Sequence, residues 1–175
     1  MAKIIKLQGA TAEIVRNAWI NFEKTAEATL DSDWHDDGAL PPGGLIVSLA
    51  VWLKHREALL LHPRTGVLLS PSDDPALLAD DIERIGLIAI AFPKFTDGRG
   101  FSSARLLRER FGFKGELRAV GQILPDTVFF LSRAGFDAFE LAEQHVDDAL
   151  TALHPFSVRY QSAFNETPLF LRRAA

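Results

Sequence analysis

Cysteine is missing altogether from this 175-residue sequence. Without thiols the chain forms no disulfide, ligates no iron–sulfur cluster, and offers neither thiolate zinc ligands nor a cysteine nucleophile. Long apolar runs are also missing, because the strongest stretch, residues 45–53, is nine residues long, about half of what a membrane-spanning helix needs. Residues 1–16 lack the apolar core of a signal peptide. We therefore expect a cytoplasmic protein without membrane spans.

An excess of positive charge is absent as well. Nineteen Lys and Arg residues stand against 23 Asp and Glu residues, which gives a net charge of −4. This balance argues against a nucleic-acid-binding protein and against a polybasic membrane anchor. The hydrophobic share of 47% and the length are typical of one soluble globular domain. We predict a single domain, with residues 1–44 as an N-terminal extension that ends in an acidic, Pro- and Gly-rich loop, and residues 45–175 as its body.

Residues 45–175 alternate between strand-like and helix-like patterns. The predicted strands are 67–69, 87–92, 117–120, 136–141 and 157–161. The predicted helices are 48–61, 73–85, one from Ser102 or Ser103 to 111–112, one from 125 to a cap at Gly135, and 142–153. In the extension we expect a strand at 4–7 and a helix at 11–24.

This alternation predicts an α/β fold. We expect an open, mostly parallel sheet of about five or six strands with helices on both faces, plus a less regular N-terminal segment. A complete eightfold barrel needs about 250 residues and is too long for this chain.

Basic side chains gather where ligands bind in such a sheet, at the carboxyl ends of its strands. Residues 94–118 hold seven basic and three acidic residues in an otherwise acidic chain. A glycine-flanked loop that leads into a helix also presents free backbone N–H groups. The predicted anion- or partner-binding residues are Lys94, Asp97, Arg99, Gly100, Ser102, Ser103, Arg105, Arg118 and Gln122. A solvated cationic helix, in which Arg105 pairs with Glu109, remains an equal alternative.

Catalytic and cofactor residues are less clearly marked. Asp97 and Glu140 follow or end different strands, so they could form an acid/base pair. Residues 98–103 approach a dinucleotide fingerprint but lack its third glycine, so no cofactor is evident, and a flavin or NADPH stays open. The acidic loop at 31–37, with His35, lacks the spacing of a calcium loop and favours a solvated loop over a metal site. Phenylalanines are dense around the basic segment, as in interface centres.

Three runs of sequence carry a resemblance. They are FPKFTDGRGFS at 92–102, GELRAVG at 115–121 and GFDAF at 135–139. These runs resemble the bacterial DUF934 family, whose members are commonly described as oxidoreductases involved in sulfite reduction. The resemblance is specific over about residues 86–141, and its motifs map onto Lys94, Asp97, Arg99, Arg118 and Gln122. In that family the gene typically lies beside the gene of an assimilatory sulfite reductase.

The resemblance implies a pathway more firmly than a reaction. Our leading hypothesis is an accessory or partner protein of cytoplasmic sulfite reduction, whose basic patch engages sulfite reductase or a small oxyanion such as sulfite, sulfate or phosphate. The second is a flavin- or nicotinamide-dependent oxidoreductase that uses the same edge. The third is an acid/base enzyme that uses Asp97 and Glu140. The missing thiols favour a binding role, because such a chain cannot relay electrons through its own cysteines.

Overall fold

A single sheet organises the computed structural model, which describes residues 2–9, 11–21 and 43–153. Its eight described strands lie in the order β2-β1-β8-β7-β6-β5-β4-β3. They are β1 (Ala2–Gln8), β2 (Thr11–Val15), β3 (Trp19–Asn21), β4 (Gly44–Ser48), β5 (Thr65–Leu69), β6 (Leu87–Phe92), β7 (Glu116–Gly121) and β8 (Ala138–Ala142). Strands β3 to β8 run parallel to one another and in chain order, whereas β1 is antiparallel to both β2 and β8. The mostly parallel α/β prediction is confirmed, and the sheet has eight strands where five or six were expected.

The N-terminal segment belongs to this sheet. The strand expected at 4–7 is confirmed within β1, but the helix expected at 11–24 is wrong over its described part, which forms β2 and β3. Gly9, at a φ of 63°, lies in the turn between β1 and β2. The β-branched residues of β2 then pair with β1, and this pairing outweighs the weak helical spacing. The predicted strand at 157–161 and the acidic loop at 31–37 lie outside the described residues.

Helical segments connect the parallel strands. They are α2 (Leu49–Lys54), α3 (Arg56–Leu61), the 3-10 helix η1 (Pro75–Asp81), α4 (Arg99–Arg105), the π-helical turn η2 (Leu106–Arg110), the 3-10 turn η3 (Pro125–Thr127), α5 (Val128–Arg133), the 3-10 turn η4 (Glu143–His145) and α6 (Val146–Ala152). Among the described residues, none of these helices is long and apolar enough to cross a membrane.

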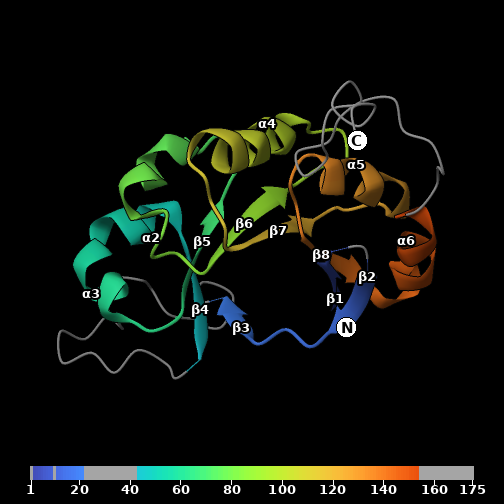
Figure 1. The fold of residues 1–175 in the computed structure, drawn as a ribbon, viewed down its shortest axis with the longest axis horizontal. Coiled ribbons are helices and arrows are strands. Elements are labelled where there is room, and N and C mark those ends of the chain that lie inside the picture. The colour runs from blue at the N-terminus through green and yellow to red at the C-terminus, as the bar shows by residue number, and fades with distance from the viewer. Residues whose placement is uncertain (1, 10, 22–42, 154–175) are drawn as a thin grey trace, which may run out of the picture.

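The described helices cover one face of the sheet, so the expectation of helices on both faces is not met in the part of the chain that the structure describes (Figure 1). Trp52 of α2, Leu107 of η2 and Leu131 of α5 share one buried cluster with Ile88 of β6 and Phe139 of β8. The reason is the strand order. Because consecutive parallel strands are neighbours and crossovers are right-handed, each connection from β4 to β8 returns on the same side.

The sheet curls strongly into a half-barrel, because its two edges are tied together. Strands β2 and β3 are at opposite edges, yet only residues 16–18 connect them. Four Cα steps reach at most about 15 Å, whereas seven strand spacings in a flat sheet measure about 34 Å. Figure 1 shows this linker crossing the side of the half-barrel that the helices leave open. The sheet therefore has a helix-covered outer face and a concave inner face.

Trp19 fills the inner face at the amino ends of the central strands. A Cβ atom added to Gly44 would lie 2.6 Å from its ring, and one added to Gly86 would lie 3.3 Å from it. Ile46 and Leu87 form a small buried cluster there, against which Trp19 packs. The part of the inner face formed by β4 to β6 is thus apolar, and the polar part lies on β7, β8 and β1.

Candidate functional site

The loop between β6 and α4, residues 93–98 (the β6–α4 loop), holds the first group of predicted site residues. Asp97 of this loop pairs with Arg99, the first residue of α4. Arg99 Nε donates to Asp97 Oδ1 at 3.0 Å, and Arg99 Nη2 donates to Asp97 Oδ2 at 2.7 Å. The backbone N–H of Arg99 also donates to Oδ1, at 3.2 Å. Lys94 and Phe95 are exposed, with 61% of Phe95 accessible to solvent. The loop is therefore clamped at its end and open at its start.

The clamp neutralises its own charges. Hydrogen bonds from Arg99 lower the pKa of the Asp97 carboxyl, and the bond to Asp97 raises the pKa of Arg99. Asp97 is thus an ionised hydrogen-bond acceptor, and the guanidinium fork of Arg99 is already filled by a carboxylate. The positive charge that the loop presents to solvent is that of Lys94, for which the described residues provide no ion-pair partner.

Gly100 and the serines have structural positions in α4. The helix begins at Arg99 with Gly98 as its N-cap, so the prediction that Ser102 or Ser103 caps it is wrong. Both serines lie inside the helix because Gly100 allows it to start earlier: a Cβ there would lie 2.5 Å from the Phe92 ring. Arg105, in the last turn, pairs with Glu109 on the exposed surface, with Nη2 3.2 Å from Oε1. This pair is the one that the solvated-helix alternative expects.

Gln122 and Arg118, which the sequence places in one set, lie in different surroundings. Gln122 is exposed after β7, and its backbone N–H donates to the Phe92 carbonyl at 2.7 Å, so it borders the β6–α4 loop. Arg118 lies in register with Ala89 in the middle of β7, and only 3% of it is exposed. Its guanidinium is on the inner face, and the structure does not bring it to the loop.

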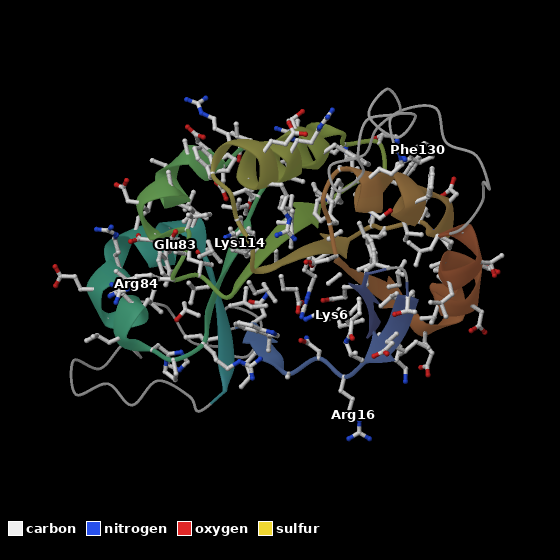
Figure 2. The ribbon with its side chains drawn as sticks, in the orientation of Figure 1. Lys6, Arg16, Glu83, Arg84, Lys114 and Phe130 are labelled. Carbon is white, nitrogen blue, oxygen red and sulfur yellow. The ribbon has the colours of Figure 1, made fainter. Side chains whose placement is uncertain are left out.

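On the inner face Arg118 belongs to a polar group that we call the inner-face network: Lys6, Asn17, Glu116 and Arg118. Arg118 Nε donates to Glu116 Oε1 at 2.9 Å, and its Nη1 donates to Asn17 Oδ1 at 2.9 Å. Lys6 Nζ donates to Glu116 Oε2 at 2.7 Å. Figure 2 shows Lys6 reaching from β1 toward the middle of the molecule, whereas the neighbouring linker residue Arg16 points away from it.

Two cations share one carboxylate in this network. Burial of Glu116 raises its pKa, but the hydrogen bond from Lys6 and the charge of Arg118 outweigh this effect, and the pKa is lowered. The side chains of Arg118 and Glu116 are only 3% and 10% exposed. Loss of one partner from such a pair leaves an uncompensated buried charge and costs about 3–5 kcal/mol. The network carries one surplus positive charge.

Glu140 lies on the same inner face, because its neighbours Phe139 and Leu141 point into the helix-side core. It pairs in register with Ile4 and is half-buried, and the described residues offer it neither a hydrogen bond nor an ion pair. The structure does not bring it to Asp97: β7 lies between β6 and β8, and Arg99 occupies the Asp97 carboxylate. Its charged neighbours along the inner face are Lys6 and Arg118.

The sequence contained a signal for the inner-face network that our predictions did not use. Successive residues of a strand point to opposite faces, so Glu116 and Arg118 had to share one face once β7 was assigned. Lys6, between the apolar Ile5 and Leu7, had to face away from the helix-side core for the same reason. Asn17 carries no such signal, because it lies in an irregular linker.

A comparison with known protein families matches the part of the chain that carries most of the residues described above. Residues 66–170 match the family described as "Bacterial protein of unknown function (DUF934)", and the match covers well over half of the chain. The chain belongs to the DUF934 family. No curated protein and no solved structure matches it. The DUF934 match includes the β6–α4 loop, Glu116, Arg118 and Glu140, whereas Lys6 and Asn17 precede it.

Proposed function

We propose that this DUF934 protein is an accessory protein of assimilatory sulfite reduction that docks on sulfite reductase through its β6–α4 loop. The observation that carries the docking surface is the exposed Phe95 beside Lys94, which has no ion-pair partner among the described residues, in a loop held in shape by the Asp97–Arg99 clamp. Gln122 borders this surface. The identity of the partner rests on the family resemblance of the motif that forms the loop.

A protein partner suits this surface better than a small oxyanion. A free sulfite or phosphate ion would have to compete with the Asp97 carboxylate for the guanidinium of Arg99. It would otherwise meet Lys94 as a single exposed cation, which is a weak site in water. An exposed aromatic ring adds nothing to oxyanion binding, but aromatic residues are enriched at the centres of protein interfaces.

The loop residues do not fit a dinucleotide. Gly100 is taken up by the close packing of α4 on Phe92, and the seven-residue α4 begins without a side-chain cap beside a paired Arg99. Packing accounts for Gly100, and Arg99 is already paired, so we derive no step through a flavin or NADPH. The acid/base alternative requires Asp97 and Glu140 together, and their positions give it no support.

The test is binding to the purified assimilatory sulfite reductase of the same organism. We expect the wild-type protein to co-elute with the reductase in gel filtration. The Lys94→Glu, Phe95→Ser double variant should bind about tenfold more weakly or worse, because hot-spot residues contribute at least about 2 kcal/mol. The matched control is Lys114→Glu with Leu61→Ser, which changes an exposed lysine and an exposed apolar residue at the amino ends of β7 and β5. This control should bind like the wild type.

Two results would reject the proposal. One is the absence of a complex with the wild-type protein at micromolar concentrations, and the other is equal binding by the loop variant and its control. A saturable rise in melting temperature with sulfite, sulfate or phosphate that Arg99→Ala abolishes would support the oxyanion alternative instead. Circular dichroism of each variant separates loss of binding from loss of folding.

A further inference from the structure

The inner face between β7, β8 and β1 separates two opposite charges. Lys6 and Arg118 are both register partners of Ala138, from opposite sides of β8. With Glu116 they leave one surplus positive charge. Glu140, two residues along β8, carries a negative charge without a partner among the described residues. Diagonal neighbours of this kind have Cα atoms roughly 7–8 Å apart.

Solvent reaches the polar part of this face, on β7, β8 and β1. Leu87, Ala89 and Arg118, toward the amino ends, are almost completely buried. Farther along the strands, Val120 and Glu140 on the same face are half-buried. The inner face is thus closed at the amino ends of β4 to β6, where Trp19 packs, and partly accessible on β7, β8 and β1, where the Lys6 side chain is 36% exposed. A half-buried carboxylate there gains from any partner that pairs with it, because unpaired charges in partly dry surroundings are costly.

We propose that this part of the inner face binds a small zwitterion of the α-amino-acid class, with its ammonium group on Glu140 and its carboxylate group on Lys6. A simple amine would satisfy Glu140 but meet the surplus positive charge of Lys6 and Arg118. A simple carboxylate would satisfy that surplus but meet Glu140. A molecule with both charges complements both, and the short Cα separation expected for the diagonal neighbours Lys6 and Glu140 favours a small one.

Each residue has a defined part in this site. Lys6 Nζ is an ammonium with three donors, of which Glu116 takes one, and its side chain is 36% exposed, so it can donate to a second carboxylate. Arg118, whose side chain is 3% exposed, holds Glu116 in place and adds positive charge to the site without contacting the ligand. Ile4, the register partner of Glu140, is buried and contributes an apolar flank.

The experiment uses the full chain and the twenty standard amino acids, each added singly at millimolar concentration. Thermal unfolding and isothermal titration report binding, because a ligand of the folded state raises the melting temperature in a saturable way. We expect at least one amino acid to bind. Its methyl ester, which lacks the carboxylate, and its N-acetyl derivative, which lacks the ammonium, should both bind at least about tenfold more weakly.

Glu140→Gln tests the assigned residue, since it removes the charge and keeps the shape. We expect its affinity for the same amino acid to fall about tenfold or more. The matched control is Glu83→Gln, an exposed carboxylate between η1 and β6, and it should bind like the wild type. The reductase complex proposed above should be unchanged in Glu140→Gln, which keeps the two proposals separable.

The proposal is overturned if none of the twenty amino acids gives a saturable shift. It is also overturned if Glu140→Gln, folded by circular dichroism, binds as tightly as the wild type. Equal binding of the methyl ester and the parent amino acid would refute the role of Lys6.

Discussion

Glu116 is held ionised by its neighbours, so its protonation and the stability of the fold are linked. Its folded-state pKa is lowered, after burial is offset by Lys6 and Arg118. A lowered carboxyl pKa adds stability above the ordinary glutamate value of about 4.3, and this stability is lost as the pH falls through the folded value. The wild-type protein should therefore lose stability in acid partly through this residue.

We expect Glu116→Gln to be less stable by about 3–5 kcal/mol at neutral pH, because buried Arg118 loses its counter-charge. The variant should lose less free energy of unfolding than the wild type when the pH is lowered from about 6 to about 3. Urea denaturation at a series of pH values measures both quantities. Parallel pH curves for the two proteins would contradict this account of Glu116.

Single residues were predictable from the sequence where their neighbours are close in the chain. Asp97 and Arg99 were named together, and a two-residue spacing is enough for their clamp. Arg118 was named but placed at the wrong surface, since its location depends on which face of β7 turns inward. Its partner Asn17 lies 101 residues away, and no local pattern announces such a contact.

The packing of α4 on β6 depends on one missing side chain. Gly100 is in contact with the ring of Phe92, which is itself packed against Phe101 and Phe136 at centroid distances of 5.8 Å. Because Phe92 is held on both sides, it cannot retreat from an added methyl group. Helix propensity would favour alanine over glycine, but by no more than about 1 kcal/mol.

We therefore expect Gly100→Ala to destabilise the protein by about 1–3 kcal/mol, as overpacking of a core usually does. Gly98→Ala is the matched control, because nothing lies within 4 Å of a Cβ at that position. It should change stability by less than about 0.5 kcal/mol. Thermal unfolding of the two variants gives the comparison, and equal melting temperatures would disprove the packing role of Gly100.

Elements with strong local patterns were predicted well, and the others were not. The apolar run of β6 matched its expected bounds, and η1 lies within the helix expected at 73–85, where the Asp74 carboxylate accepts a hydrogen bond from Ala76. Strand β4 was missed, because its apolar residues run directly into α2 and no turn residue separates them. Strand β2 was missed because only its partner β1 makes it a strand.

At the scale of the whole molecule, the curl of the sheet depends on the linker at residues 16–18. Deletion of Arg16 and Ala18 would leave two Cα steps, with a reach of about 7.6 Å, between the ends of β2 and β3. We expect a loss of at least about 3 kcal/mol, because Trp19 or β2 must then leave its packing site. Insertion of Gly-Ser after Arg16 should cost less than about 1 kcal/mol. Urea denaturation measures the free energy of unfolding of both variants. Equal values would show that the length of the linker does not constrain the sheet.

The curl itself was not predictable from the rhythm of strands and helices. That rhythm is the same for a doubly wound sheet and for a sheet wound in one direction, and only the strand order distinguishes them. The order became one-directional because each strand from β4 to β8 pairs with its predecessor. The only sequence feature that indicates the curl is the short linker between β2 and β3. It indicates a curl only once both segments are known to be edge strands.

The pairing of β1 with β8 also delays the completion of the sheet during protein synthesis. Ile4 and its register partner Glu140 are 136 residues apart, so the ribosome makes the N-terminal hairpin long before its docking site exists. At 5–20 residues per second the wait is roughly 7–27 s. During this time the unpaired edge of β1 is free to bind a chaperone or another nascent chain. The β1–β2 hairpin is therefore among the last segments to join the sheet, and a pause in translation before residue 138 would prolong its exposure.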